Sequence, residues 1–272
     1  MKAQDLFNVQ RLVTIVTGGA NGIGYACAEA MVDNGANVTI IDRDPEALAR
    51  AVERLKHNGG TAFGEVADVT DKAALTRAFD AVAERHGRID VVFANAGISG
   101  GPGFLNAQNE RDPTRAIENL SDDLWDRVIA TNLTSCFRTI QIAARHMKAT
   151  GGGRIVVTSS CSAEKIEHYV GTVYVTSKAG VAHLVRQAAI ELAEYKIQVN
   201  AIAPGPCITN IGGGRLQDKK AQEFFATKHP NHRMATPEDM QGAALYLASP
   251  ASRHVNGAHI LIDGGFTLGT AG

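Results

Sequence analysis

Two side chains four residues apart have types that could carry out acid–base chemistry together. Tyr174 and Lys178 share one face if they lie on a helix. The pKa of a free tyrosine is about 10, whereas a general acid or base works best with a pKa closer to the working pH. A fall of about three pKa units requires ~4 kcal/mol of preferential stabilisation of the phenolate. We expect the ammonium of Lys178 to supply part of that stabilisation.

A pair of serines follows the short apolar run at 154–158. The second of the pair, Ser160, carries a hydroxyl that could hold a substrate oxygen and stabilise charge that develops on it. Ser159 is the competing choice, and Ser162 could share the role. These residue types indicate proton transfer at a hydroxyl or carbonyl group of a substrate.

A glycine-rich segment between a predicted strand and a predicted helix has the pattern Gly18-xxx-Gly22-x-Gly24. Backbone N–H groups and the helix dipole at such a junction favour a pyrophosphate. Gly18 can make the sharp turn, Gly22 can let the phosphate approach, and Gly24 can let helix and strand pack closely. The spacing departs from strict GxGxxG. We expect a nucleotide cofactor with a pyrophosphate to bind at this turn and to contact Gly18, Asn21, Gly22, Ile23 and Gly24.

An acidic residue, Asp42, ends the second predicted strand, about 20 residues past these glycines. Its carboxylate would accept hydrogen bonds from the adenosine ribose hydroxyls, and it would repel a 2′-phosphate at close range. The sequence therefore favours NAD over NADP as the cofactor. Arg43 follows directly, and its guanidinium could turn towards a phosphate, so NADP stays as the less favoured alternative.

The pattern of the whole chain supplies the elements that would position these residues. Short apolar runs alternate with segments of helical period, which is typical of βα units around a parallel sheet. The runs predict seven strands, at 12–16, 38–41, 62–66, 91–94, 154–158, 198–203 and 259–262, and helices that include 23–32, 44–56, 71–85, 121–147 and 174–193. Long connections at 95–120 and 204–236 are expected to be functional or mobile. No composition break resembles a linker, so we predict a single domain over 1–272.

Composition excludes several other classes of protein. The 272 residues carry 27 Lys plus Arg against 28 Asp plus Glu, which gives a net charge of −1 and no general field to attract nucleic acid or an anionic membrane. No apolar run approaches the ~20 residues that span a bilayer, and residues 1–11 lack the apolar core of a secretion signal. The four cysteines are scattered without metal-ligand spacing. We expect a cytoplasmic protein with reduced thiols, no metal site and no nucleic-acid or membrane partner.

Several short motifs, taken in their order along the chain, resemble the classical short-chain dehydrogenase/reductase family. They are the glycine turn with Thr17 before it, Asn95-Ala96-Gly97, Asn132, Ser160 and Tyr174-xxx-Lys178. The resemblance covers essentially the whole chain. It implies an α/β fold with a Rossmann-like, doubly wound, seven-stranded, mostly parallel sheet and helices on both faces. It also implies a nicotinamide cofactor and the interconversion of a secondary alcohol and its ketone.

The resemblance assigns roles to the matching residues. Tyr174 would take the hydroxyl proton during oxidation or return it during reduction, and Lys178 would also hold the nicotinamide ribose. Asn132 would bend its helix and relay protons through water to the lysine. Further cofactor contacts would come from Asn95, Ala96 and Gly97 at the riboses, Asp68 and Val69 at the adenine, and Pro204, Cys207 and Thr209 at the carboxamide. For Asp68, a plain role in capping the next helix is the alternative.

Three segments remain for choosing the small-molecule alcohol or ketone: 98–120, the stretch after Ser160, and 210–236. The second is unusually charged, and we expect a polar or hydroxyl-bearing substrate that His168 would contact; a solvated rim is the alternative. The resemblance implies a homotetramer, or a homodimer. Two other functions stay open: an epimerase or dehydratase of the wider superfamily, and a non-enzymatic NAD-binding sensor on the same fold.

Overall fold

The computed structural model contains one seven-stranded sheet. It describes residues 2–57, 59–106 and 108–269. All neighbouring strands pair in parallel, in the order β3-β2-β1-β4-β5-β6-β7. The strands are β1 (Val13–Thr17), β2 (Asn37–Asp42), β3 (Thr61–Val66), β4 (Val91–Ala94), β5 (Gly153–Thr158), β6 (Ile197–Pro204) and β7 (His259–Ile262). The predicted fold class is confirmed.

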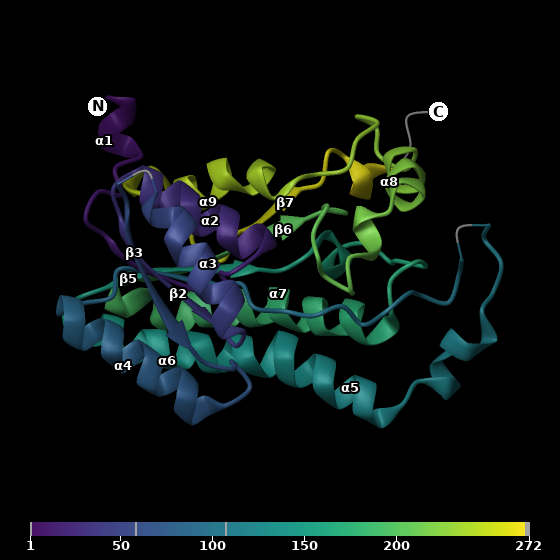
Figure 1. Ribbon diagram of the computed structural model, residues 1–272, viewed down its shortest axis with the longest axis horizontal. Coiled ribbons are helices and arrows are strands. Elements are labelled where there is room, and N and C mark those ends of the chain that lie inside the picture. Colours follow the sequence, from purple (N-terminus) through teal and green to yellow (C-terminus); the bar gives the residue numbers. More distant parts are fainter. Residues whose placement is uncertain (1, 58, 107, 270–272) are drawn as a thin grey trace.

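Helices cover both faces of the sheet (Figure 1). One face packs against α2 (Gly22–Asp33), α3 (Pro45–Lys56) and α9 (Gln241–Ala248), and the other against α4 (Lys72–His86), α6 (Ser135–Thr150) and α7 (Thr172–Leu192). Each layer has its own apolar core, with Met31 and Leu247 fully or almost fully buried in the first and Phe79 and Met147 in the second. Burial on both faces explains why the strands are nearly continuous apolar runs.

Local signals in the sequence set most helix starts. Asp44 and Asp71 cap α3 and α4, because their carboxylates accept hydrogen bonds from backbone N–H groups of the first turn. Ser121 caps α5 (Asp122–Ile129) through Oγ in the same way. Most predicted boundaries of strands and helices lie within one residue of the observed ones, which is the ordinary uncertainty at the ends of these elements.

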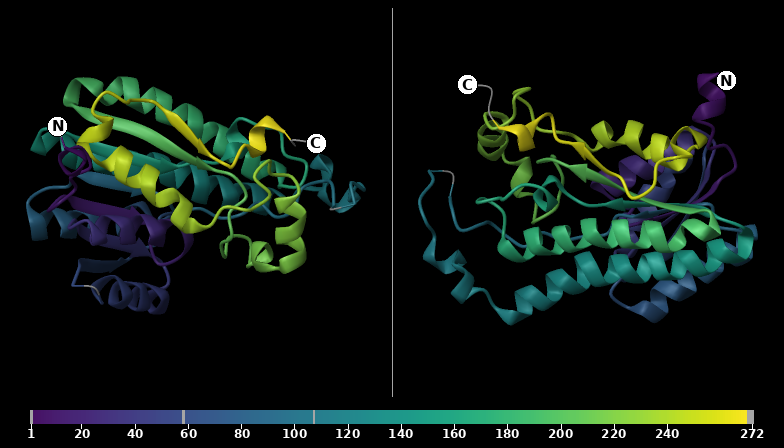
Figure 2. Two further views of the ribbon diagram at one scale, coloured as in Figure 1. Left: turned by 90° about the horizontal axis from the view of Figure 1, so that it is seen from above. Right: turned by 180° about the vertical axis from the view of Figure 1, so that it is seen from behind.

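The helix predicted over 121–147 runs unbroken from α5 into α6 through a π-helical turn, Ala130–Thr134. One expectation about the elements was wrong: the loop predicted over 204–236 contains a helix, α8 (Lys219–Ala226). The N-terminal segment, for which no element is predicted, forms the short α1 (Ala3–Leu6). The second view in Figure 2 shows the long segment from β4 to α5 extending well beyond the sheet.

The sheet has its topological switch point between β1 and β4. From β1 the chain runs outward to β2 and β3 on one side, and from β4 it runs outward on the other. Ligands of such sheets bind beyond the carboxyl ends of the strands at this point. Among the described residues, no helix is both long enough and apolar enough to cross a bilayer.

Candidate active site

A cavity of about 570 Å³ lies along the carboxyl ends of six strands, β1 to β6. It brings together residues that are far apart in the sequence, from the glycine turn after β1 to the loop after β6. Of the residues predicted for the site, all but Gly24 and Asn132 line it. The sequence prediction therefore selected residues that fold into one continuous space.

The glycine turn closes one side of this cavity and leaves the start of α2 open. Gly18 has φ +63°, a left-handed conformation that favours glycine. Gly24 stands so close to the carbonyl of Gly18 and to the side chain of Asn95 that a Cβ would collide with both. Asn21 is the N-cap of α2 but makes no side-chain cap hydrogen bond. The first N–H groups of α2 are thus free for an anionic group in the cavity.

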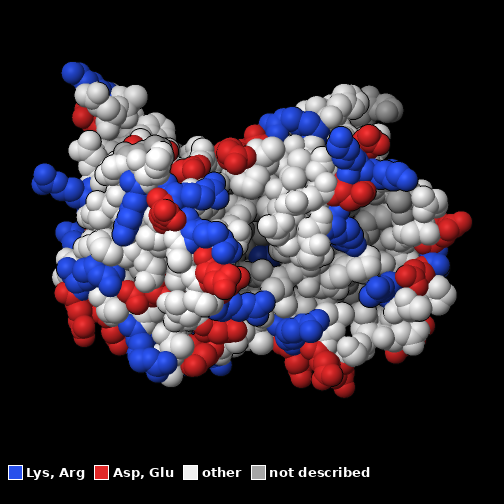
Figure 3. All heavy atoms as spheres, viewed as in Figure 1, with Lys and Arg blue, Asp and Glu red and all other residues white. Residues whose placement is uncertain are grey.

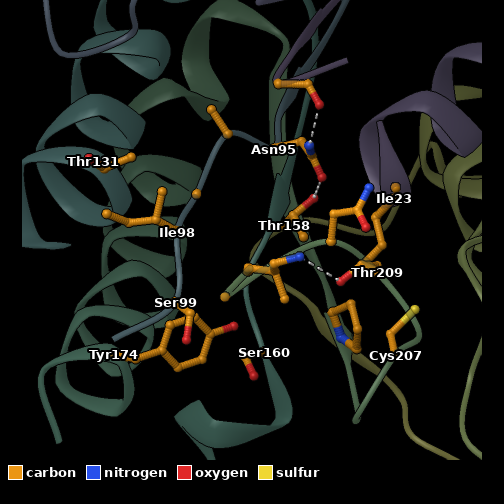
Figure 4. Close-up of a pocket in the computed structure, with 18 of the residues that line it drawn as sticks. Ile23, Asn95, Ile98, Ser99, Thr131, Thr158, Ser160, Tyr174, Cys207 and Thr209 are labelled. Carbon is orange, nitrogen blue, oxygen red and sulfur yellow. Dashed lines mark hydrogen bonds between the residues drawn. The ribbon is translucent and has the colours of Figure 1, made fainter. Parts of the chain in front are cut away.

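Asn95 fixes the glycine turn against the end of β5. Its Nδ2 donates to the carbonyl oxygens of Thr17 and Gly18, at 3.2 Å and 3.1 Å. Its Oδ1 accepts a hydrogen bond of 3.0 Å from Oγ1 of Thr158 (Figure 4). Asn95 therefore positions the backbone of the turn.

Asp42 presents its carboxylate to the cavity at the end of β2. Backbone N–H groups of Ala20 and Asp44 donate to its two oxygens at 3.2 Å and 3.3 Å, which fixes the side chain. The guanidinium of Arg43 lies 4.0 Å from the carboxylate of Asp68 and is largely exposed.

Asp68 is held by its own loop. Its Oδ1 accepts from both the backbone N–H and the hydroxyl of Thr70, at 2.8 Å and 2.7 Å. These hydrogen bonds lower its pKa, although burial acts in the opposite direction and is the largest single influence. The cap of α4 is Asp71, so the plain capping alternative for Asp68 was wrong.

Tyr174 and Ser160 meet at the other end of the cavity, with their hydroxyls close together in Figure 4. The Ser160 hydroxyl acts to lower the pKa of Tyr174, and Oγ of Ser160 accepts a hydrogen bond from the backbone N–H of Ser162 at 3.1 Å. Ser159 instead directs its hydroxyl towards the carbonyl oxygen of Lys178, 3.5 Å away. Among the described residues, Ser160 is the serine whose hydroxyl influences the pKa of Tyr174.

Lys178 lies one turn along α7 from Tyr174 and is 4% exposed. Its Nζ donates to the carbonyl oxygen of Thr158 at 2.8 Å and stands 5.7 Å from the centroid of the Tyr174 ring. The lysine is therefore fixed against the end of β5, with its charge beside the phenol.

Burial shifts the pKa values of Tyr174 and Lys178 in opposite directions. It raises the pKa of Tyr174 to about 12, against the opposing effect of the Ser160 hydroxyl, and it lowers the pKa of Lys178 to about 8. The expectation that Lys178 brings the tyrosine pKa towards neutral is not met by the protein groups alone, because desolvation of the phenolate is the larger effect. A further positive charge in the cavity would act in the lowering direction.

Asn132 lies behind the cavity wall, within the π-helical turn, and is 2% exposed. Its Oδ1 accepts from the N–H of Ile98 at 2.8 Å, and its Nδ2 donates to the carbonyl of Ile98 at 3.0 Å and to Oγ of Ser177 at 3.1 Å. Both amide hydrogens are thus committed to the protein. The side chain ties the loop after β4 to α7, and Ser177 and Ile98 are site-supporting residues that the sequence did not reveal.

The loop after β6 closes the cavity opposite Asn95. Thr209 packs against the glycine turn, where a Cβ on Gly22 would lie 3.4 Å from its methyl group. Cys207 is buried and pairs by a parallel bridge with Ala235. Burial raises the pKa of its thiol to about 12, so it is a neutral wall residue at ordinary pH.

The charged stretch after Ser160 contributes a residue other than the one expected. His168 is exposed, stacks edge-on against Phe104 and Tyr169, and is not among the residues that line the cavity. The neighbouring Glu167 lines the cavity and is only 7% exposed. The exposure of His168 fits the alternative of a solvated rim, and the residue of this stretch that lines the cavity is Glu167.

Charge on the surface is mixed. On the face in Figure 3, basic and acidic side chains alternate without a large patch of one sign. Within residues 2–57, 59–106 and 108–269, no group of three or more His, Cys, Asp or Glu is arranged to hold a metal ion.

Comparison with known proteins gives many similar chains of the same length. Residues 18–267 match a family model described as Enoyl-(Acyl carrier protein) reductase. The cis-4-hydroxycyclohexanecarboxylate dehydrogenase of Sinomonas cyclohexanicum is 37% identical over 94% of this chain and 96% of its own. The L-rhamnose 1-dehydrogenase (NAD(P)(+)) of Azotobacter vinelandii is 35% identical over 92% of this chain and 94% of its own.

A solved structure agrees with these matches. The gluconate 5-dehydrogenase from Burkholderia cenocepacia J2315, in complex with NADP and tartrate, is 31% identical. It superposes with a TM-score of 0.86 over 98% of this chain and 99% of its own. With the parallel sheet, the glycine turn and the Tyr174–Lys178 pair already in place, these matches identify the chain as a member of the classical short-chain dehydrogenase/reductase family of oxidoreductases.

Proposed function

We propose that the protein interconverts a secondary alcohol and its ketone with NAD, through Tyr174, Lys178, Ser160 and Asn132. The observation that carries this proposal is the single cavity that joins the open start of α2 and Asp42 to the Tyr174–Ser160 pair. A dinucleotide has two phosphates between two ribosides, so it needs such an elongated space with an anion-binding turn near its middle.

The residues present fit a nicotinamide dinucleotide. The start of α2 offers free N–H groups for the pyrophosphate, and the glycine turn lets it approach. Asp68, Val69, Lys178 and Thr209 all line the cavity; the first two would contact the adenine and the last two the nicotinamide half. Bound there, the cofactor would accept a hydride from the alcohol carbon or return it to the ketone.

Residues of the chain then bind the substrate oxygen and transfer its proton. In oxidation Tyr174, as phenolate, takes the hydroxyl proton of the alcohol, and in reduction it gives that proton to the carbonyl oxygen. Ser160 holds the same oxygen by a hydrogen bond and stabilises the charge that develops on it. Lys178 favours the phenolate by its nearby positive charge. Asn132 keeps α7 and the loop after β4 at a fixed separation.

The choice of NAD over NADP rests on Asp42. Two backbone N–H groups hold its carboxylate at the end of β2, where it suits ribose hydroxyls and would face a 2′-phosphate directly. Arg43 leans towards Asp68, and that pairing reduces its availability for a phosphate. The charge balance at this end of the cavity therefore favours NAD.

The substrate is proposed to be polar and to carry further hydroxyl groups. The relatives named above act on a sugar, a hydroxycyclohexanecarboxylate and gluconate according to their names, all of which bear secondary alcohols. Residues 98–120 and 204–236 are proposed to form the substrate loops, because both contribute to the cavity wall. We also propose that the protein is a cytoplasmic homotetramer; exposed Leu261 on the edge strand β7 and the nearby exposed Ile166 offer apolar surface for a second copy.

The proposal is tested by following the absorbance of reduced nicotinamide while the protein meets secondary alcohols, sugars, polyols and hydroxy acids, first with NAD and then with NADP. We expect turnover with NAD on a hydroxyl-rich substrate. Tight binding of NAD in calorimetry, without turnover on any compound in either direction, would contradict the proposal and favour a sensor.

A further inference from the structure

A buried carboxylate in the substrate end of the cavity is not used by the chemistry described above. Glu167 lines the same cavity as Ser160 and Tyr174 and is 93% buried, since only 7% of its surface is exposed. Its Oε1 is fully buried and accepts no hydrogen bond from any described residue. A carboxylate without a partner is costly to bury, so a group that lacks protein donors at such a position points to a ligand that supplies them.

The backbone around Glu167 is fixed on both sides. The carbonyl of His168 accepts from the N–H of Leu105 at 3.1 Å, and the N–H of Gly171 donates to the carbonyl of Gly101 at 3.0 Å. An antiparallel bridge joins Val170 to Pro102. The loop after β5 is therefore attached to the loop after β4, and this attachment holds the carboxylate against the cavity without a movement of the chain.

The nearest positive charge does not neutralise this carboxylate by contact. Lys165 donates its Nζ to the carbonyl oxygen of Phe266 at 2.7 Å and lies 4.1 Å from the centroid of that ring. No salt bridge within 4.0 Å joins it to Glu167 in the described part of the chain. Cys161, which is close to both Glu167 and Tyr174, is a buried neutral thiol. Glu167 and Tyr174 therefore line the same cavity, with the neutral Cys161 close to both.

A positive group of the cavity wall is more exposed than Glu167. Arg215, in the loop after β6, lines the cavity and is exposed; partial burial lowers the pKa of its guanidinium, and the nearby Arg115 lowers it further. An exposed guanidinium is screened by water, whereas a buried carboxylate keeps most of its field. For a substrate held at Tyr174, we expect Glu167 to have the stronger influence.

We propose that Glu167 is the specificity-determining residue of this site: its carboxylate accepts a hydrogen bond from a second hydroxyl of a neutral polyol or sugar and rejects the matching acid. This inference rests on the proposed function and deepens it. Polyol hydroxyls donate to a carboxylate through charge-assisted hydrogen bonds, and an analogue without that hydroxyl leaves the carboxylate unpaired. A substrate carboxylate near Glu167 would meet a like charge at low dielectric.

The test compares three kinds of substrate on the complete protein with NAD at pH 8.5, where Glu167, with its pKa raised by burial to about 7, is ionised. The neutral set is threitol, xylitol and sorbitol; the acid set is threonate, xylonate and gluconate, with equal carbon numbers; and 2-butanol has no second hydroxyl. The variants are Glu167→Gln, which removes the charge and keeps the shape, and Glu164→Gln on the same loop, whose partner His259 lies outside the cavity.

We expect wild-type protein to prefer the polyol over the acid of equal length by about tenfold or more in kcat/KM. In Glu167→Gln this preference should fall by about tenfold, mainly through a higher KM for the polyol. The kcat/KM of this variant for 2-butanol should stay within about twofold of the wild-type value. Glu164→Gln should keep the preference. A purely structural role for Glu167 would lower kcat/KM for all substrates alike and overturn the inference.

Two further outcomes are decisive. If the wild type prefers the acids over the polyols, the charge that selects the substrate is that of Arg215. The proposed role of Glu167 would then be refuted, while the proposed oxidoreductase function would stand. No turnover of any substrate by the wild type would instead remove the proposed function, and the inference would fall with it.

Discussion

Nζ of Lys178 donates a hydrogen bond to the backbone carbonyl of Thr158, at 2.8 Å, and so ties the middle of α7 to the end of β5. The hydroxyl of Thr158 in turn donates to Asn95, which holds the glycine turn. The lysine that stands beside the tyrosine is thus part of a continuous set of hydrogen bonds that reaches the anion-binding turn. Movement at one end of the cavity is limited by contacts that begin at the other.

Replacing the lysine by an apolar side chain of similar length tests its electrostatic role. In Lys178→Met, we expect kcat/KM to fall by about 100-fold or more, because the phenolate of Tyr174 loses its nearby positive charge. The melting temperature should stay within a few degrees, since the ammonium is itself costly to bury. Steady-state kinetics and thermal unfolding measure the two effects. The control Lys72→Met, exposed on α4, should change neither; full activity in Lys178→Met would refute the assigned role.

The amide of Asn132 is predicted to matter for stability as well as activity. Asn132→Ala removes three hydrogen bonds to Ile98 and Ser177. At about 1 kcal/mol each, the loss should lower the melting temperature by roughly 5–10 °C in a chain of this size. Differential scanning calorimetry measures this loss. Asn34→Ala, at the exposed end of α2, should lower the melting temperature far less. An equal decrease in both variants would show that the buried hydrogen bonds of Asn132 do not stabilise the protein more than an exposed one.

Asp42 is predicted to set the choice of cofactor. In Asp42→Ala, kcat/KM with NAD should fall by about tenfold or more, because hydrogen bonds from ribose hydroxyls to a charged group are lost. With NADP, the kcat/KM of Asp42→Ala should rise, because the repulsion between the carboxylate and the 2′-phosphate is removed. Kinetics with both cofactors measure the ratio, and Asp33→Ala on the exposed end of α2 serves as the control. An unchanged ratio would show that Asp42 does not discriminate.

Glu167 gives the protein a pH-dependent stability. Burial raises the pKa of Glu167 from 4.5 to about 7, while Lys165 acts weakly in the opposite direction. The folded protein therefore binds this proton more tightly than the unfolded chain does. The stabilising contribution is fully present below pH 4.5 and is lost as the pH rises through 7.

The melting temperature of the wild type relative to Glu167→Gln should therefore fall between about pH 5 and pH 8, by at least about 2 °C. Scanning calorimetry of both proteins across this range measures the difference. Glu118→Gln, an exposed site outside the cavity, should show a constant difference from the wild type. A constant difference for Glu167→Gln as well would mean that this carboxyl titrates normally in the folded protein.

Much of the fold could be predicted from the sequence because its signals are local. Asp44 and Asp71 cap helices by hydrogen bonds to the next few residues, and β4 is bounded by the apolar run itself. The π-helical turn at Ala130–Thr134 could not be predicted, since the apolar period continues across it. The helix α8 was missed because eight residues, KKAQEFFA, are too few to show a clear helical period.

The residues of the site likewise divide into those with a local signal in the sequence and those without one. Gly18, Tyr174 and Lys178 could be found because their chemistry depends on spacing within one turn. Glu167 could not be assigned, since an acid in a charged run is normally solvated. Its burial comes from the packing of its loop against residues 100–105, which are more than sixty positions away. Contacts of that kind are properties of the folded chain and leave no local pattern.

The central claim, that Tyr174 exchanges the proton of a substrate hydroxyl, is tested most directly by Tyr174→Phe. The variant removes one oxygen atom and keeps the ring in place. We predict that it binds NAD within about threefold of the wild type in calorimetry and loses at least about 100-fold in turnover, followed by the absorbance of reduced nicotinamide. Turnover of the variant within about tenfold of the wild type, with the same substrate and cofactor, would contradict the account.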